Sequence, residues 1–305
     1  MNGGTAMMRI LGIVGVQICI CVPIIVFQFC KGKEFFSKEY WGYALRIGIP
    51  IVPHYLSGII LNQGDRIMID KMVGKTEVAL YGLAYSIGML VQLFISGMNS
   101  ALTPWMYSKI KKGDIRSMRK VLQLLSVVVV GIAVALMMIS PELVLIFGSP
   151  KYREAVYVIP PVAASVFFIF IYNILSMPQF YYEKTQFLMA ASMAAAGANV
   201  VLNFIFIRLF GYIAAGYTTL ACYMLYSVGH YIVSKRILVN EGIQENLMNP
   251  GFLLACSVFL IGASIICNLI FPYRILRYAI LLASAGLVFW KKELLLKTMA
   301  DIRKK

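Results

Sequence analysis

The side chains with chemical potential in this sequence are polar residues set inside long apolar runs. One such run begins near Arg46, includes His54 and ends at residues 62–66, which read Asn-Gln-Gly-Asp-Arg. A charge at the centre of a bilayer costs about 3 kcal/mol on insertion scales, so it tends to face a cavity or a partner. Pro50 and Pro53 remove backbone donors from the same run and predict a kinked helix. Such a helix, polar at both ends, is typical of a cavity wall.

Each of these residues also has a purely structural interpretation. Arg46 is equally compatible with a side chain that snorkels to the interface. For His54, a core histidine bonded to a neighbouring carbonyl is the favoured interpretation. Arg66 and Asp70 are four residues apart and are able to pair. The segment from Asp65 is then interpreted as a solvated helix end, and every acidic residue is expected at a helix end or in a loop.

A second polar pair lies in a run rich in alanine, over residues 187–207. Small residues at this spacing let transmembrane helices approach closely. Asn199 and Asn203 are four apart and share a helix face, which favours a hydrogen bond to another helix over a polar path. Asn99 is a lone polar residue with the same interpretation, and Arg208 follows near the end of the run.

The sequence shows no catalytic constellation. It has two histidines, and it has no HExxH, no GxSxG and no phosphate-binding glycine loop. The six cysteines lack the paired spacing of a zinc site, so we predict buried thiols without disulfides. We therefore expect neither an enzyme nor a cofactor or metal, and any transport must draw on an ion gradient, the membrane potential or a partner.

The amino-acid composition is typical of an integral membrane protein. Of its 305 residues, 60% are hydrophobic and 13% charged, and its mean hydropathy is +0.80. Soluble domains are roughly 45–50% apolar and about 25% charged, and disordered chains are less hydrophobic still. A bilayer core requires about 20 mostly apolar residues per helix. The predicted spans are residues 10–30, 44–64, 79–104, 121–140, 156–180, 187–207, 213–234, 252–271 and 276–291.

Charge predicts the orientation. The net charge is +15, and 19 of the 28 basic residues fall on one side if the C-terminus is cytoplasmic. The positive-inside rule then places the N-terminus outside. This distribution over several loops also argues against nucleic acid as the partner and favours anionic lipid. The first run is not a signal peptide, because its lysines follow it rather than precede it.

Residues 49–88 and 101–110 resemble the polysaccharide flippases, the O-antigen and teichoic-acid exporters of the multidrug/oligosaccharidyl-lipid/polysaccharide superfamily. A proline-rich helix start, an Asp-Arg pair, a tyrosine after the loop and a Pro-Trp helix end carry the resemblance. The matching residues are Pro50, Pro53, Asp65, Arg66, Tyr81, Pro104 and Trp105. Leu80-Tyr81-Gly82 departs from the commoner Gly-Leu-Tyr order. A second resemblance lies at 199–216, and the whole covers about residues 31–240.

The resemblance implies an all-α fold of about nine transmembrane helices, equivalent to the second six-helix lobe of a two-lobe flippase plus two extra helices. Residues 1–40 would be the last helix of a missing first lobe and a cytoplasmic linker. Residues 41–240 would form the second lobe. Residues 241–305 would hold two additional helices and a basic cytoplasmic tail.

The implied function is export of an undecaprenyl-diphosphate-linked oligosaccharide across the bacterial plasma membrane by alternating access. The partners expected are this lipid, membrane lipids, and a separately encoded first lobe or a second copy of the chain. The arginines would bind the phosphate groups, and the other polar side chains would bind the sugars. The candidate residues are Arg46, His54, Asn62, Gln63, Asp65, Arg66, Asn99, Asn199, Asn203 and Arg208.

Three other functions compete with export. A remnant or partner-dependent subunit without independent transport is compatible with the missing lobe. A cation-coupled drug exporter would require an acidic residue deep in a span, which this sequence is not expected to have. A membrane polymerase or glycosyltransferase would require a large outer loop, whereas the longest candidate, about residues 141–155, is short.

Overall fold

The computed structural model describes residues 3–33 and 36–290, and it divides into two compact units at Ile49 and Pro50. The first unit contains α1 (Gly3–Gly32) and the start of α2 (Lys38–Met72). Its α1 is mostly apolar, with Gln17 and Gln28 the polar residues of its middle and later turns, and its hydrophobic side chains from Met7 onward are exposed. Such a helix, apolar on all sides, requires an apolar environment.

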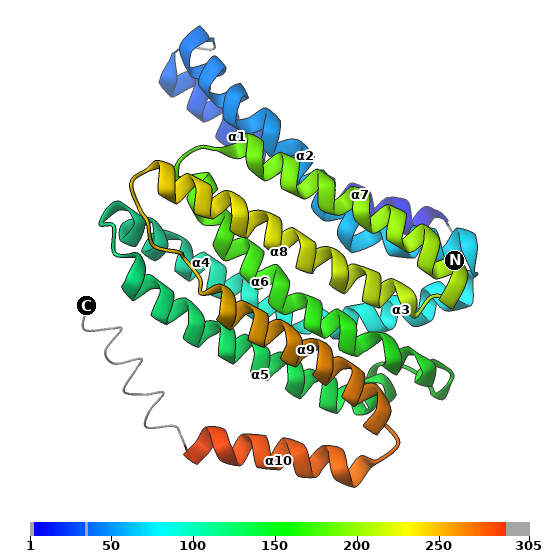
Figure 1. Ribbon diagram of the computed structural model, residues 1–305. Helices are drawn as coiled ribbons and strands as arrows, with labels where there is room; N and C mark the ends of the chain where they lie inside the picture. Colours follow the sequence, from blue (N-terminus) through cyan, green and yellow to red (C-terminus); the bar gives the residue numbers. More distant parts are fainter. Residues whose placement is uncertain (1–2, 34–35, 291–305) are drawn as a thin grey trace. The chain divides into compact units, whose positions relative to one another are not determined.

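The second unit holds the rest of α2 and all later elements, and within the described residues every regular element is helical (Figure 1). The fold is therefore an all-α membrane protein, as predicted. The remaining elements are α3 (Lys75–Gly88), α4 (Leu90–Lys111), α5 (Ile115–Phe147), the 3-10 helix η1 (Pro150–Val158), α6 (Ile159–Tyr181), α7 (Thr185–Phe210), α8 (Ala214–Asn240), α9 (Pro250–Ile270) and α10 (Arg274–Trp290).

Each predicted span coincides with a helix or with two consecutive helices, but the helices are longer than the apolar runs. In the described part of the chain, seven helical stretches are long and apolar enough to cross a membrane. Those two criteria do not select α8 and α10. α8 carries buried polar side chains along its length, and the described part of α10 has only 17 residues.

The turns between helices follow local rules. Gly113 adopts a φ of +69°, a region that favours glycine, and Asp114 then caps α5 by accepting the Ser117 N–H. Lys109 at the end of α4 forms an ion pair of 2.6 Å with the same Asp114. Asn249 caps α9 by accepting two backbone N–H groups, with proline at the first helical position.

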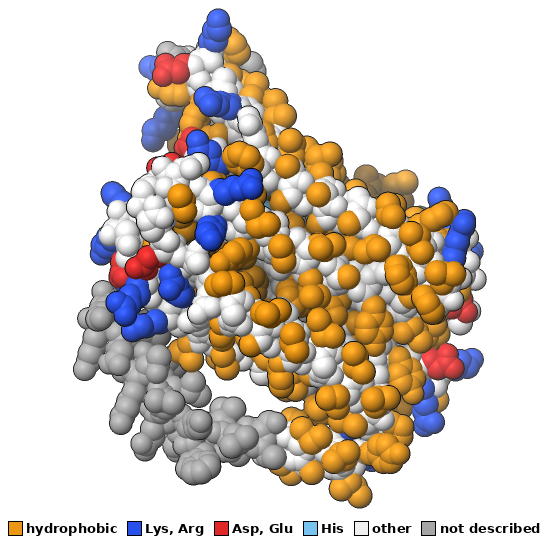
Figure 2. Space-filling model, viewed as in Figure 1, with side chains coloured by type: hydrophobic (Ala, Val, Ile, Leu, Met, Phe, Trp, Pro, Cys, Tyr) orange, Lys and Arg blue, Asp and Glu red, His pale blue; other side chains and the backbone are white. Residues whose placement is uncertain are grey.

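The core of the second unit is built around α6. Its residues from Ile159 to Ile171 are all buried, and α6 packs against α4, α5, α8 and α9 (Figure 1). On the face shown in Figure 2, hydrophobic side chains cover the middle of the helices and charged ones gather near helix ends. This arrangement suits a bundle surrounded by hydrocarbon at its middle and by water at its ends.

A proline break in α5 provides the attachment point for α10. Pro141 has no N–H, so the carbonyl of Met137 lacks its usual intrahelical donor. The Ser140 hydroxyl donates to that carbonyl at 2.7 Å, and Arg277 Nη1 donates to the carbonyl of Met138 at 2.6 Å. The carbonyl freed by Pro141 is thus satisfied within α5, and the next carbonyl along the helix accepts from a side chain of α10.

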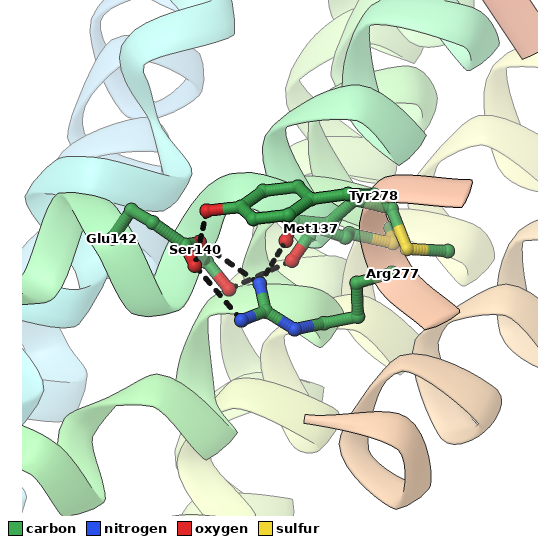
Figure 3. Close-up of polar contacts among 6 residues, drawn as sticks. Met137, Ser140, Glu142, Arg277 and Tyr278 are labelled. Carbon is green, nitrogen blue, oxygen red and sulfur yellow. Dashed lines mark hydrogen bonds and ion pairs between the residues drawn. The ribbon is translucent and has the colours of Figure 1, made fainter. Parts of the chain in front are cut away.

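Arg277 also binds Glu142 through both terminal nitrogens, each at 2.8 Å (Figure 3). Tyr278 donates to the same carboxylate at 2.9 Å. The guanidinium is 3% exposed and Glu142 25% exposed. A bidentate pair with one buried partner fixes orientation, and removing one partner leaves an uncompensated charge. α10 is therefore attached to α5 by a directional contact as well as by apolar packing.

We expect Arg277→Ala to reduce the free energy of unfolding by about 3 kcal/mol, because Glu142 loses its partner and the Met138 carbonyl its donor. Arg274→Ala is the matched control, since Arg274 is exposed on the same helix and forms no ion pair within the described residues. It should change stability by less than about 0.5 kcal/mol. Thermal unfolding in detergent measures both, and equal losses would contradict the assignment.

Candidate functional site

Asp65 is the centre of the most polar cluster in the second unit. α2 continues to Met72, so Asp65 lies inside the helix, and it is completely buried. Its Oδ2 accepts hydrogen bonds from the Tyr81 hydroxyl and, at 2.7 Å, from the Thr219 hydroxyl. Its Oδ1 accepts from Asn203 Nδ2 at 2.6 Å. The predictions of a solvated helix end here, and of acidic residues only at helix ends, were therefore wrong.

Three helices supply these donors, and a second layer orients them. Tyr81 comes from α3, Asn203 from α7 and Thr219 from α8. Asn203 also donates to Asn199 Oδ1 at 3.1 Å and accepts from Thr218. The predicted interhelical bond from the asparagine pair is confirmed, since Asn203 joins α7 to α2 and α8. Asn199 Nδ2 is buried and has no hydrogen-bond partner among the described residues.

The chemistry of this cluster is that of a carboxylate held by neutral donors. In the part of the chain that is described, no Lys or Arg forms an ion pair with Asp65. A buried charge without a counterion favours either protonation or a bound cation. The surrounding hydroxyl and amide oxygens are ligands that a small hard cation prefers. In the described structure the carboxylate is held by hydrogen bonds alone.

Arg66 lies beside this cluster and makes different contacts from those predicted. The expected pair with Asp70 does not form. Arg66 Nη1 instead donates to Gln63 at 2.9 Å, and its guanidinium lies 5.2 Å from the Tyr85 ring centre. Its Nε is buried and has no hydrogen-bond partner among the described residues. The positive charge is thus held in place without being neutralised.

A polar stripe continues from this point along α3 and α4. Asn62 accepts from the Tyr85 hydroxyl at 2.8 Å, which joins the end of α2 to α3. Further polar side chains follow on α3 and α4 and lie at least partly exposed, and on α4 they recur at intervals of three or four residues from Gln92 to Thr103. The stripe consists of Asn62, Gln63, Arg66, Ser86, Gln92, Ser96, Asn99, Ser100 and Thr103. The serine and threonine hydroxyls of the stripe bond carbonyls of their own helix, so the members that call for water, a substrate or another polar surface are Arg66, Gln92 and Asn99.

His54 belongs to a second polar cluster, between α2, α7 and α8. Its Nδ1 lies 2.5 Å from the Ser192 hydroxyl and 3.1 Å from the Tyr226 hydroxyl. The prediction that His54 bonds a neighbouring backbone carbonyl was wrong, because its Nδ1 contacts side chains of α7 and α8 instead. Tyr172 of α6 stacks on Tyr226 with ring centres 4.4 Å apart.

Two of the predicted residues lie apart from these clusters. Arg46 is exposed in the first unit, so it is not placed relative to the clusters of the second. Arg208 is exposed at the end of α7, with its guanidinium 4.0 Å from the Phe204 ring centre. The sequence interpretation did not assign site roles to Tyr81, Thr219 or Tyr226. Their spacing is ordinary for apolar helices, and only the register between helices reveals their partners.

With this geometry established, comparison with known proteins finds a family match over the first third of the chain. Residues 5–111 match the polysaccharide biosynthesis protein family. The matched segment contains α2, α3, α4 and the motif residues at 49–88 and 101–110. The resemblance to this family is thereby confirmed for the N-terminal part of the chain, and it suggests polysaccharide-related membrane transport.

Two curated relatives are similar to about half of the chain. Protein 1 of the Lsg locus of Haemophilus influenzae is 28% identical over 172 residues, which are 53% of this chain and 41% of the relative. An uncharacterized membrane protein of the same organism is 29% identical over 167 residues, covering 51% of this chain and 40% of the relative. The aligned part thus spans about two fifths of each relative. No solved structure matches the chain significantly.

We expect Asp65→Leu to lower the free energy of unfolding by about 3 kcal/mol or more, because three buried donors lose their acceptor. Asp65→Asn should cost less than about 1 kcal/mol. Its amide oxygen still accepts from Tyr81 and Thr219, and a flip of the Asn203 and Asn199 amides satisfies the new N–H groups. Asn199 Nδ2 then gains a partner.

The control is Asp70→Asn, an exposed carboxylate on the same helix, which should be neutral within about 0.5 kcal/mol. Thermal unfolding of the four proteins in one detergent gives the comparison. A stable Asp65→Leu variant would show that the cluster does not hold the helices together.

Proposed function

We propose that this protein exports an undecaprenyl-diphosphate-linked oligosaccharide across the bacterial plasma membrane by alternating access. The N-terminus would lie outside and the C-terminus in the cytoplasm, as the charge distribution favours. The match of residues 5–111 to the polysaccharide biosynthesis family supports the substrate class.

The observation that carries this proposal is the polar stripe along α2, α3 and α4. A diphosphate and several sugars cross hydrocarbon only if a polar surface replaces their water. The stripe supplies amides and hydroxyls within two helical stretches that are long and apolar enough to cross a membrane, where hydrocarbon would otherwise make unpaired polar groups costly. Sugar hydroxyls are suitable partners for such groups, since both donate and accept.

Arg66 is the phosphate ligand that we assign on this surface. It lies at one end of the stripe with its charge unpaired, and Tyr85 and Gln63 fix its guanidinium. Arginine binds phosphate oxygens in a bidentate manner and keeps its charge at any physiological pH. In this assignment the sugars would extend from Arg66 toward Asn99, along the exposed side of α4.

Asp65 is proposed as the coupling residue. Because its carboxylate joins α2 to α3, α7 and α8, binding of a proton or a sodium ion would alter contacts on four helices at once. A cation that prefers one arrangement of these helices shifts the population between two states. This carboxylate also supplies the deep acidic residue that a cation-coupled drug exporter needs, so that function is the second candidate.

The stripe also requires a surface opposite to it during transport. We propose a separately encoded first lobe or a second copy of the chain in that role. Either would close a water-filled path between two bundles, and rocking of one against the other would expose the path to each side in turn.

Complementation tests the export function directly. Residues 1–305 are expressed in a bacterial strain that lacks its own polysaccharide flippase, with and without a separately expressed first lobe. Surface glycan is then measured. Restoration in either strain supports the proposal, and the comparison identifies the partner. Absence of surface glycan in both, with the protein present in the membrane, would overturn it.

Ion coupling is tested in proteoliposomes with a fluorescent polyprenyl-diphosphate oligosaccharide and imposed proton or sodium gradients. We expect Asp65→Asn to abolish the gradient dependence, because it removes the charge and keeps the hydrogen bonds. Asp70→Asn is the control and should retain it. Ethidium efflux is measured in parallel. Gradient-driven efflux of ethidium without movement of the glycolipid would favour the drug exporter.

A further inference from the structure

A recess of about 180 Å³ lies between α2, α6 and α8, with Tyr223 among its lining residues. Its lining differs from the apolar grooves elsewhere on the second unit. It carries aromatic rings together with an imidazole, an amide and hydroxyl groups, and no Lys, Arg, Asp or Glu. The residues that matter for its chemistry are His54, Tyr172, Asn173, Phe180, Tyr223 and Tyr226.

Stacking and hydrogen bonds make the walls of this recess rigid. Tyr172 lies between Tyr223 and Tyr226, with ring centres 6.2 Å and 4.4 Å away. Behind Tyr226, His230 is completely buried, and its Nδ1 lies 2.7 Å from Gln179 Nε2. A site of fixed shape loses little conformational entropy when it binds a ligand.

Several polar groups on the walls have bonding capacity to spare. The Ser192 hydroxyl donates to the carbonyl of Leu188, so it is free to accept from His54 Nδ1–H. Within the described residues, the Asn173 amide and the Tyr172 hydroxyl form no side-chain hydrogen bond. The recess therefore offers at least two acceptors and two donors.

We infer that this recess binds one sugar ring of the glycan, an assignment that rests on the proposed function. A pyranose has hydroxyls around its edge and C–H groups on its faces, which match polar groups set between aromatic rings. Ligand pockets for drug-sized molecules have roughly 300–1,000 Å³, so this volume accommodates a single ring rather than an oligosaccharide. Neutral walls give a diphosphate no counter-charge, which directs the diphosphate to Arg66 and a sugar to the recess.

The test is saturation-transfer NMR on the full chain in nanodiscs, with free monosaccharides as probes. The panel is glucose, galactose, rhamnose, N-acetylglucosamine and N-acetylgalactosamine, with choline added because aromatic cages also bind quaternary ammonium groups. We expect transfer to at least one sugar. Asn173→Leu and Tyr172→Phe should each weaken it about fivefold, the value of one hydrogen bond of about 1 kcal/mol.

Tyr157→Phe is the matched control, because this tyrosine lies on η1 outside the recess and its hydroxyl forms no hydrogen bond among the described residues. It should leave transfer unchanged. Asn173→Ser serves if Asn173→Leu does not fold. Transfer to no sugar, transfer to choline alone, or transfer that neither recess variant alters would each overturn the inference.

Complementation separates this inference from the proposed function. A chain that restores surface glycan but shows no sugar transfer retains its export role and loses the recess assignment. A chain that binds sugar in the recess but restores no surface glycan retains the recess assignment and loses the export role.

Discussion

The second unit depends on one constraint: a carboxylate lies inside an apolar bundle and must be satisfied there. Asp65 is completely buried, and donors from α3, α7 and α8 converge on its two oxygens. An unsatisfied carboxylate at this depth would cost several kcal/mol, so this residue constrains how α2, α3, α7 and α8 align within the packed bundle. Apolar packing alone would tolerate small shifts between the same helices, because it has no direction. Directional bonds to one centre do not tolerate them, which makes the cluster a natural point of control over helix arrangement.

The other polar residues of the second unit must also be hydrogen-bonded or reached by water, and they meet this requirement in different ways. Arg277 pairs with Glu142 and donates to the carbonyl of Met138 near the proline of α5, and these contacts attach α10 to α5. The stripe on α2, α3 and α4 remains open, because most of its side chains satisfy only their own helix, as Ser96 and Ser100 do through carbonyls four residues earlier. The Asp65 carboxylate is held by donors from three helices, whereas the stripe keeps two buried acceptors, Gln92 Oε1 and Asn99 Oδ1, without a partner among the described residues. The proposed function assigns coupling to the Asp65 cluster and substrate contact to the stripe.

These features combine into one physical account of transport. A charged diphosphate at Arg66, sugars along the stripe and one ring in the recess would each meet a surface of matching chemistry. Asn62 connects the three regions, since its carbonyl oxygen accepts from Tyr85 beside Arg66 and, at 3.4 Å, from Tyr223 on the wall of the recess. A change in the Asp65 cluster would reach both sites through α2 and α3, because packed helices shift as rigid elements rather than deform continuously.

The sequence by itself determined the membrane class, the positions of the helices and the family resemblance of residues 49–110, because apolar runs and glycine or proline turns act locally. It also placed Asn199 and Asn203 on one helix face, since a spacing of four is a property of a single helix. Only the tertiary structure decided what those residues contact. Asp65 looked like a solvated helix end, yet α2 continues through it and three other helices surround it. His54 was expected to bond a carbonyl, and side chains more than a hundred residues away bind it instead. Such partners depend on the register between helices, which burial of the whole bundle sets and no local pattern encodes.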